Sequence, residues 1–401
     1  MKRLCSKKTP FGVLLMLTIG RKNRLINRVE KGNFKILFFV VKNSLRSDCN
    51  MKFEALTIKD IGKALGLSTS TVSRALRDSH EISAETKKLV IEYAEKNNYH
   101  PNPIALSLKE RRSRSIGVVV CEIANSYFSQ AINGIESIAY NNGYNVIISQ
   151  SRESFDREML NLQYLTSRSI DGLIISVSTE TKDFSYLKEL HSKGMPIVFF
   201  DRIVHDIETH KVIADNYKGA YDATTHLINS GYRRIAAISN PALLSITIER
   251  LAGYKAALAD NGIAVDDSLI KYCQHGGMIF SEVEEVVNEL LDLQQKPDVI
   301  FATADKLTTN CLRLLKAKGL IVPQDIGLLG FSNTDLTELL DPPLSIIKQP
   351  AFEMGEVSMN LLLQLIESKR PVTEFETKVL STELLIRGST KKMKSKAKET
   401  A

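Results

Sequence analysis

The chain has 401 residues, of which 43% are hydrophobic and 25% are charged. This length suffices for two or three domains that each bury a core, and the composition excludes wholesale disorder and collagen-like or membrane-embedded architectures. Charge is unevenly distributed: residues 1–50 carry 12 basic and 2 acidic side chains and residues 387–401 carry 6 and 1, whereas residues 116–386 carry 23 and 35. A basic N-terminal region on an acidic body predicts a polyanionic partner for that region.

The first fifty residues contain an apolar run, from Phe11 to Gly20, that imitates a signal peptide. The run is too short to span a bilayer, no small-residue cleavage site follows it, and Met51 resembles a natural start. We therefore interpret residues 1–50 as a mis-called upstream extension or a disordered N-terminal tail, with a membrane anchor as the alternative. No membrane partner is expected for the rest of the chain.

The five cysteines are scattered, without the CxxC or paired spacing that zinc sites and disulfide frameworks need. GxSxG, HExxH, Walker-loop and GxGxxG patterns are also missing from the contexts that each requires. "HGG" at residues 275–277 has no matching nucleophile and is interpreted as a plain turn. We therefore expect reduced thiols, no bound metal, no cofactor and no enzymatic activity.

Three short helices are predicted after the N-terminal extension. Thr57 and Asp60 have the spacing of a capping box at the start of the first helix, which Gly66 ends. Ser68 and Ser83 are the predicted N-caps of the second and third helices.

The second helix has one apolar and one polar face. Val72, Ala75 and Leu76 lie on the apolar face, while hydroxyls and two arginines face outward. The third helix is expected to pack through Leu89, Val90, Ile91, Tyr93 and Ala94. Two short helices joined by a tight glycine-containing turn and closed by a third predict a helix-turn-helix headpiece over residues 56–100.

The polar face of the second helix carries the candidate DNA contacts. Small hydroxyls permit close approach and donate to phosphates or base edges, and arginine can bind guanine through two N–H groups. The alternative is that these serines and threonines are only solvated caps. The candidate DNA-binding residues, two of them from the following segment, are Ser68, Thr69, Ser70, Thr71, Ser73, Arg74, Asn102 and Leu108.

A hinge helix and linker are predicted over residues 101–115. Asn102 is its N-cap and Pro103 occupies the first helical position. So short a helix should fold only against a partner or on DNA. Leu108 either wedges into a base step of the minor groove and kinks the duplex or packs against the neighbouring domain.

An α/β core with a βαβ rhythm is predicted from Ser115 onward. The strand-like runs "SIGVVV", "NVIIS", "DGLIIS" and "MPIVFF" alternate with helical stretches, and a second series runs through "KVIAD", "RRIAAIS", "DVIFATAD" and "IGLLGFS". This rhythm predicts two subdomains, each a doubly wound parallel sheet with helices on both faces. The fold class is therefore α/β, with an all-α headpiece and a two-subdomain core that leaves a cleft at the carboxyl ends of its strands.

Polar and aromatic side chains follow several of these predicted strands. They suit hydrogen bonds to sugar hydroxyls and stacking on a pyranose face. The alternative is that they are ordinary helix caps or loop salt bridges. The candidates from position alone are Asn125, Tyr127, Phe128, Ser176, Asp201, Arg202 and Asp305.

The stretch "LTIKDIGKALGLSTSTVSRALRDSHEISAETKKLVIEYAEKNNYHPNPIALSL" resembles the headpiece and hinge of the lactose-repressor/galactose-repressor family of bacterial transcription regulators. The resemblance continues through "IADNYKGAYDATTHLINSGYRRIAAIS", "ERLAGYKAAL" and "IGLLGFSNTDLTELLDPPLSIIKQP", and covers about residues 56–390. It implies a periplasmic-binding-protein-like core over residues 116–388, followed by a basic tail. The implied divisions are an N-subdomain of residues 116–211 and 345–372, a C-subdomain of residues 212–343 and 374–388, crossovers near residues 211, 344 and 373, and a tail of residues 389–401.

The resemblance also implies which residues contact an effector. The matching positions are Phe128, Arg202, Arg250, Asp305 and Asn333. One departure is visible, because the family usually has Asn-Pro-Phe-Phe where this chain reads Asn125-Ser126-Tyr127-Phe128. The loop is therefore expected to be less rigid, and it gains a hydroxyl.

Together these features predict a cytoplasmic, sequence-specific transcriptional regulator, a repressor of carbohydrate-utilisation genes that binds a small carbohydrate effector between two subdomains. The tail has no apolar heptads for a coiled coil, so a homodimer on near-palindromic double-stranded operator DNA is expected. Induction and co-repression both stay open. The alternative is a sugar-binding receptor or a sugar-converting enzyme with an accessory basic module. A periplasmic receptor would have no use for a helix-turn-helix and would need a cleavable signal.

Overall fold

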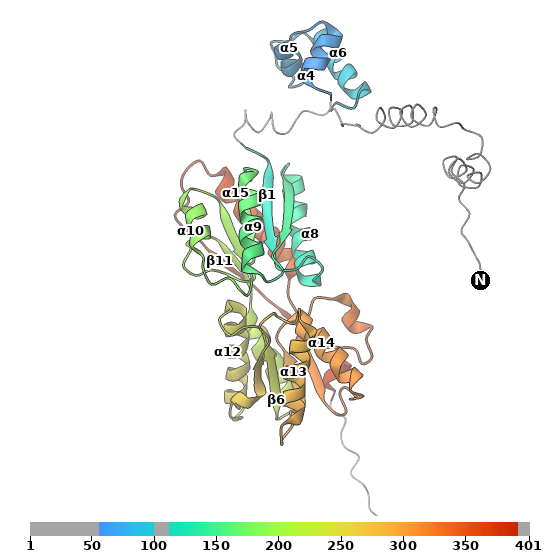
Figure 1. The fold of residues 1–401 in the computed structure, drawn as a ribbon, viewed down its shortest axis with the longest axis vertical. Helices are drawn as coiled ribbons and strands as arrows, with labels where there is room; N and C mark the ends of the chain where they lie inside the picture. Colours follow the sequence, from blue (N-terminus) through green and yellow to red (C-terminus); the bar gives the residue numbers. More distant parts are fainter. Residues whose placement is uncertain (1–55, 100–111, 392–401) are drawn as a thin grey trace, which may run out of the picture. The chain divides into compact units, whose positions relative to one another are not determined.

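The computed structural model describes residues 56–99 and 112–391 (Figure 1). These belong to two compact units, residues 1–102 and 103–401. Several predictions fall outside the described residues: those for the extension of residues 1–50, for Asn102 and Leu108 in the hinge, and for residues 392–401 of the tail.

The headpiece contains three helices, α4 (Ile58–Leu65), α5 (Thr69–Ala75) and α6 (Ala84–Lys96). Each helix begins after its predicted N-cap, because the hydroxyls of Thr57, Ser68 and Ser83 each accept the backbone N–H three residues further on. The capping box between Thr57 and Asp60 is present, and Gly66 ends α4 in the left-handed conformation, with φ of 69°.

A small cluster of apolar side chains holds the three helices together. Its fully or nearly buried members are Ile61, Val72, Ala75, Val90, Ala94 and Tyr99. The prediction was wrong for two residues of the third helix, since Leu89 and Ile91 are 47% and 41% exposed. Neighbours of Val90 and Ala94 along a helix point away from the face that those two residues bury.

The core contains two six-stranded sheets, one in each subdomain (Figure 1). The N-subdomain sheet has the order β11-β5-β4-β3-β1-β2, and all its neighbours are parallel. Its strands are β1 (Ser115–Val120), β2 (Asn145–Gln150), β3 (Gly172–Ile175), β4 (Ile197–Phe200), β5 (Lys211–Ala214) and β11 (Thr377–Leu380).

The C-subdomain sheet has the order β12-β10-β9-β8-β6-β7. It differs from the predicted parallel sheet at one edge, where β12 runs antiparallel to β10. Its strands are β6 (Ile235–Ser239), β7 (Ile270–Tyr272), β8 (Val299–Ala302), β9 (Gly327–Phe331), β10 (Ser345–Lys348) and β12 (Glu383–Leu385).

Helices cover both faces of each sheet. In the N-subdomain, α8 (Ser126–Asn141) and α15 (Ala351–Glu367) pack on one face, and α9 (Phe155–Ser167) and α10 (Ser185–Ser192) pack on the other. The C-subdomain places α11 (Asn216–Asn229) and α12 (Ser245–Asp260) opposite α13 (Phe280–Asp292) and α14 (Asp305–Ala317). Short 3-10 helices occupy Asp267–Leu269, Asp335–Glu338 and Gly388–Thr390.

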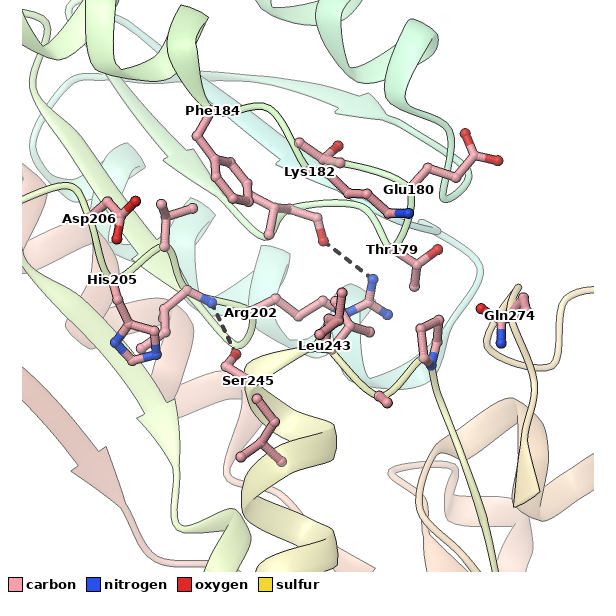
Figure 2. A pocket seen from close by; sticks show the side chains of 18 of the residues that line it. Thr179, Glu180, Lys182, Phe184, Arg202, His205, Asp206, Leu243, Ser245 and Gln274 are labelled. Atoms are coloured by element: carbon pink, nitrogen blue, oxygen red, sulfur yellow. Dashed lines mark hydrogen bonds between the residues drawn. The ribbon is translucent and has the colours of Figure 1, made fainter. Parts of the chain in front are cut away.

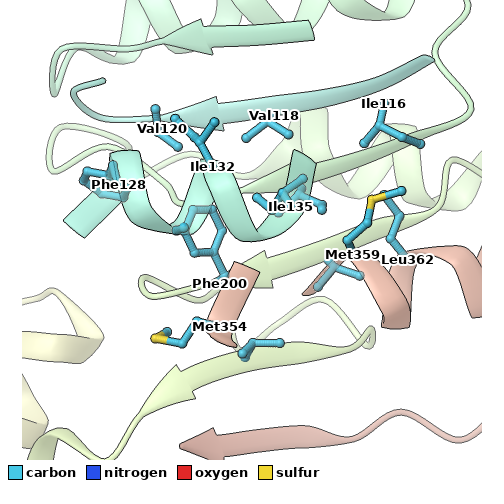
Figure 3. Close-up of a cluster of buried hydrophobic side chains, with 14 of the residues drawn as sticks. Ile116, Val118, Val120, Phe128, Ile132, Ile135, Phe200, Met354, Met359 and Leu362 are labelled. Atoms are coloured by element: carbon cyan, nitrogen blue, oxygen red, sulfur yellow. The ribbon is translucent and has the colours of Figure 1, made fainter. Parts of the chain in front are cut away.

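Alternate side chains of a strand pack against the helices on opposite faces of the N-subdomain sheet. Ile116, Val118 and Val120 of β1 pack with α8 and α15 (Figure 3), whereas Val119 points to the layer of α9. α8 and α15 approach so closely that a Cβ on Gly134 would lie 2.0 Å from the carbonyl oxygen of Phe352. This packing anchors a C-terminal helix in the N-subdomain.

The crossovers between the subdomains lie later in the chain than predicted. β5 pairs with β4 in the N-subdomain, although "KVIAD" was grouped with the second series. β10 pairs with β9 in the C-subdomain, and β11 pairs with β5 in the N-subdomain. The crossovers near residues 211, 344 and 373 are therefore corrected to the segments after Ala214, Lys348 and Leu380, because an apolar run does not indicate which of two similar sheets it will join.

Within residues 56–99 and 112–391, no helix is both long and apolar enough to cross a membrane. The same residues contain no cluster of three or more His, Cys, Asp or Glu side chains that could hold a metal ion. Cys121, Cys273 and Cys311 are buried free thiols.

Candidate functional site

The exposed face of α5 carries the candidate DNA-binding residues. Thr69, Ser70 and Arg74 are exposed, and Thr71 and Ser73 are half-buried. The face therefore presents hydroxyls beside a guanidinium, as the sequence predicted, outside the headpiece core.

Some hydroxyls of this face are engaged in local contacts. Ser68 Oγ accepts the Thr71 N–H at 3.1 Å and lies 2.7 Å from Ser70 Oγ and 2.8 Å from Thr71 Oγ1. Arg77 donates to the Ser73 carbonyl at 2.9 Å and to the Ser73 hydroxyl. Ser68 therefore caps α5, as the alternative interpretation expected, and a contact between Ser68 and DNA would be a second role.

Arg74 is held at the surface by an exposed ion pair. Its Nη1 lies 3.0 Å from Glu81 Oε2, and each side chain is about half exposed, at 54% and 53%. Exposed pairs of this kind contribute roughly 0–1 kcal/mol. The guanidinium can therefore exchange Glu81 for a phosphate or a guanine edge at small cost.

A cavity of about 600 Å³ lies between the two subdomains of the core (Figure 2). One wall comes from the loops that follow β3 and β4, and the other comes from the segment between β6 and α12 and the turn after β7. The lining side chains used below are those of Thr179, Glu180, Lys182, Phe184, Arg202, His205, Asp206, Leu243, Ser245, Gln274 and His275. This is the edge at which the carboxyl ends of the strands meet.

Of the eight candidate effector-binding residues, Arg202 alone lines this cavity. Its guanidinium makes a bidentate pair with Glu153, through Nη1–Oε2 at 2.6 Å and Nη2–Oε1 at 2.9 Å. Nη1 also donates to Cys121 Sγ and to the Val177 carbonyl, at 3.1 and 3.3 Å. Burial favours the neutral acid, but the Arg202 charge and hydrogen bonds outweigh it and hold the pKa of Glu153 below its ordinary value.

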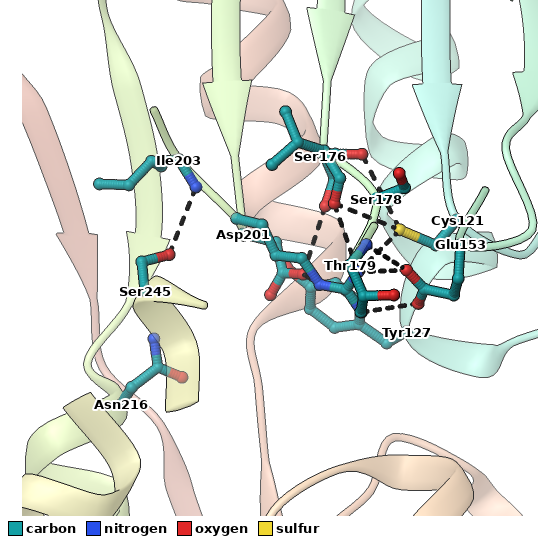
Figure 4. Close-up of polar contacts among 12 residues, drawn as sticks. Cys121, Tyr127, Glu153, Ser176, Ser178, Thr179, Asp201, Ile203, Asn216 and Ser245 are labelled. Atoms are coloured by element: carbon teal, nitrogen blue, oxygen red, sulfur yellow. Dashed lines mark hydrogen bonds and ion pairs between the residues drawn. The ribbon is translucent and has the colours of Figure 1, made fainter. Parts of the chain in front are cut away.

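Two more carboxyls, those of Asp201 and Glu158, are buried near this pair; Figure 4 shows Asp201 and Glu153. Ser176 donates to Asp201 at 3.4 Å, and Glu158 accepts the Ser178 N–H at 2.6 Å and the Thr181 hydroxyl at 2.8 Å. Burial raises the pKa of both Glu158 and Asp201 above the ordinary values. Ser176 therefore acts within a buried polar cluster rather than on the cavity surface.

Arg250 is also engaged inside the protein. Its Nε donates to Asn216 Oδ1 at 2.8 Å, its Nη1 donates to the Thr303 carbonyl, and its guanidinium lies 3.8 Å from the centre of the Phe331 ring. Burial lowers the pKa of Arg250 to about 10. The residue links β8, β9 and α11 rather than lining the cavity.

Tyr127 and Phe128 begin α8 as part of the apolar core. Their rings meet edge to face at 5.2 Å between centroids, and Phe128 also meets Phe200 at 6.1 Å. The Tyr127 hydroxyl is not turned into the cavity, because it donates to Met354 Sδ at 3.4 Å. Burial raises the pKa of Tyr127 well above its ordinary value.

Asn125 and Asp305 line a separate cavity of about 450 Å³. Asn125 is the N-cap of α8, and Asp305 opens α14 and accepts the Ser332 hydroxyl. Burial raises the pKa of Asp305. Asn125 therefore has the capping role that the sequence left as an alternative, whereas the N-cap of α14 is Ala304 and not Asp305.

Asn333 forms a contact between the subdomains. Asn333 Nδ2 donates to Gln130 Oε1 at 2.9 Å, and Gln130 Nε2 donates to the Asn333 carbonyl at 3.0 Å. Asn333 also donates to the Gln349 carbonyl at 2.7 Å, in the second crossover. It therefore ties α8 to the end of β9.

Sequence reasoning missed most of the cavity lining. Thr179, Lys182, Phe184 and Gln274 lie in turns after strands, where no periodicity marks a residue. Their positions after predicted strands were the available signal. "HGG" is a turn as predicted, with positive φ at both glycines, but His275 also lines the cavity.

Two family profiles match the chain. "Bacterial regulatory proteins, lacI family" matches residues 57–102, and "Periplasmic binding proteins and sugar binding domain of LacI family" matches residues 113–387. Among curated proteins, the HTH-type transcriptional repressor CytR of Escherichia coli (strain K12) is 34% identical over 337 residues, which are 84% of this chain and 97% of that protein.

Solved structures resemble the chain as well. The lac repressor dimer bound to operator and the anti-inducer ONPF gives a TM-score of 0.69 at 25% identity, covering 84% of this chain and 99% of that one. The complex of the transcriptional regulator CelR with cellobiose gives a TM-score of 0.59 at 28% identity, covering 83% and 99%.

Proposed function

The chain belongs to the LacI family of bacterial regulatory proteins and is a DNA-binding transcriptional repressor with an effector-binding core, and we propose that it controls carbohydrate-utilisation genes in response to a small sugar-like effector. Relatives such as CytR are transcriptional repressors, not enzymes, so the alternative of a sugar-converting enzyme is set aside. The repressor role also supports a cytoplasmic location, where operator DNA is accessible.

The observation that carries the proposal is the cavity between the subdomains. Both subdomains supply its walls, so an effector bound there would contact both of them. Its volume of about 600 Å³ lies within the range of small-molecule sites. Hydroxyl, amide and imidazole groups beside apolar side chains suit a sugar-like ligand.

The headpiece supplies the proposed operator contacts. Ser68, Thr69, Ser70, Thr71, Ser73 and Arg74 face the DNA from α5, with Asn102 and Leu108 in the hinge as further proposed contacts. The exposure of this face and the small energy that holds Arg74 to Glu81 support the assignment. We expect phosphates and a guanine edge to be the targets.

A homodimer on a near-palindromic operator is part of the same proposal. β2 lies at the edge of the N-subdomain sheet, and apolar side chains on β2 and α9 are exposed. Ile148 is 39%, Leu160 is 65% and Tyr164 is 49% exposed. A second copy would cover these side chains and would place two headpieces on two half-sites.

Coupling between cavity and operator follows from the contacts that join the subdomains. Lys306 pairs with Glu122 at 3.1 Å, and the Ile203 N–H reaches Ser245 Oγ at 3.4 Å. An effector with different affinity for two subdomain arrangements shifts the balance between them and thereby the operator affinity. Both induction and co-repression are compatible with this linkage.

The test begins with the full chain and a pool of random double-stranded DNA. We expect selection of a near-palindromic site, followed by a thermal-shift panel of neutral sugars, sugar acids and sugar phosphates in which a hit changes affinity for that site. Gln274→Ala, at the cavity, should weaken the hit, whereas Gln294→Ala, at an exposed position after α13, should not. Failure to select any sequence over scrambled DNA would contradict the proposal.

A further inference from the structure

Arg202 places a buried positive charge on the cavity wall, and that charge is already compensated. Glu153 occupies one edge of the guanidinium through two hydrogen bonds, and Cys121 Sγ and the Val177 carbonyl accept from Nη1. Arg202 and Glu153 are each about 6% exposed or less. An anionic ligand would therefore have to compete with a buried, bidentate carboxylate.

The backbone that carries Glu153 is held in an unusual conformation. Arg152 and Glu153 both have positive φ, 51° and 63°, although neither is glycine. The Thr179 N–H, on the opposite loop, donates to Glu153 Oε2 at 2.9 Å. The turn after β2 thus places the carboxylate against Arg202 in a backbone conformation that has an energetic cost for non-glycine residues.

Among the described residues, no other buried cation on this wall is available to bind an anionic ligand in place of Arg202. Arg250 is committed to Asn216, the Thr303 carbonyl and the Phe331 ring. Lys182 is exposed at the rim, where water screens its charge, and Glu180 lies at the same rim (Figure 2).

Two side-chain atoms on the same wall can still form hydrogen bonds. Arg202 Nε, which lies 3.9 Å from Asp201 Oδ2, and Thr179 Oγ1 are buried and have no hydrogen-bond partner within the described residues. One N–H donor and one hydroxyl match the hydroxyl groups of an uncharged ligand. A ligand that satisfied them would remove two unpaired polar atoms from the interior.

We propose that the cavity selects an uncharged effector, and that Glu153 is the specificity-determining residue because it occupies the guanidinium of Arg202. The inference rests on the proposed function only in taking this cavity as the effector site. Sugar acids and sugar phosphates are excluded as effectors, whereas neutral sugars and other uncharged polyhydroxyl compounds are accepted.

Inorganic phosphate is the probe, measured on the full chain at pH 7 against sodium chloride of equal ionic strength. The wild-type protein should show no phosphate-specific stabilisation. Glu153→Gln keeps the side-chain shape but frees the guanidinium, and its phosphate affinity should rise about ten- to a hundredfold, as expected for hydrogen bonds to a charged group. The double variant Glu153→Gln/Arg202→Gln should lose this gain.

Glu180→Gln is the matched control, because it removes the same charge from the rim without freeing an arginine; Glu180 accepts the Phe155 N–H instead. Glu153→Asp serves if the glutamine variant does not fold, since the shorter side chain keeps the charge but withdraws from the guanidinium, and it should show a smaller gain. Salting-out stabilisation by phosphate affects all variants alike and cancels in the comparison.

Three results would overturn the inference: phosphate binding by the wild type that Arg202→Gln abolishes, equal gains in Glu153→Gln and Glu180→Gln, or no gain in either Glu153 variant. Operator selection by the wild type is scored separately. A protein that fails to bind operator refutes the proposed function, while the phosphate result still reports on the cavity.

Discussion

In the headpiece, the candidate contact residues of α5 lie outside a core of six buried side chains, whereas in the α/β core most candidate effector residues are themselves buried. Arg74 is paired only with an exposed glutamate. Arg202 and Arg250 each have several partners inside the protein. Substitutions in the headpiece should therefore change binding with little effect on stability, and substitutions in the core should change both.

The largest expected effect is that of Arg202→Ala. It leaves Glu153 buried without its partner, so the core should lose about 3–5 kcal/mol of unfolding free energy. Urea denaturation of the full chain measures this loss when unfolding is monitored with a signal that reports on the core and not on the headpiece. The double variant Glu153→Gln/Arg202→Met should recover most of it, and a double variant as unstable as the single one would show that the pair is not the cause.

Arg74→Ala should change operator binding and leave the unfolding free energy almost unchanged, the opposite of what is expected for Arg202→Ala. Specific operator binding should weaken by about 1–3 kcal/mol if the guanidinium contacts a base edge. Stability should change by no more than about 0.5 kcal/mol, since only an exposed ion pair is removed. Titrations against operator and scrambled DNA test this, and unchanged discrimination would contradict the placement of Arg74.

Two serine caps allow a matched test within the headpiece. Ser68 and Ser83 accept the N–H of Thr71 and Thr86, respectively, at 3.1 and 3.3 Å. Replacing either with alanine should destabilise the headpiece by about 1 kcal/mol, seen as faster hydrogen exchange in residues 56–99 of the full chain. We expect only Ser68→Ala to lower operator affinity beyond this shared loss, and equal affinities would assign Ser68 a capping role alone.

The smallest effect is a pH dependence in the core. Burial raises the pKa of Glu158 above its ordinary value of 4.5, so the folded state retains this proton more strongly than the unfolded state. Protonated Glu158 therefore contributes its full stabilisation below the pKa that it has in the unfolded state. This stabilisation is lost as pH rises through the pKa that it has in the folded state. Glu158→Gln should flatten this fall in unfolding free energy, which urea denaturation at a series of pH values measures.

Local signals in the sequence were sufficient for the headpiece. Caps at Thr57, Ser68 and Ser83 and the stop at Gly66 depend on residues within four positions of one another, and all four are present. The prediction that Leu89 and Ile91 pack in the core was wrong, because an apolar run in the sequence does not say which face of a helix is covered.

The sequence by itself determined the alternation of strands and helices, the α/β class and the headpiece, since hydrophobic periodicity and capping act over a few residues. Only the tertiary structure decided the crossovers after Ala214, Lys348 and Leu380 and the pairing of Glu153 with Arg202. Glu153 and Arg202, 49 positions apart, meet because the segments after β2 and β4 lie at the same edge of one sheet, and no local pattern encodes that meeting. The availability of Arg202 to a ligand depends on this contact.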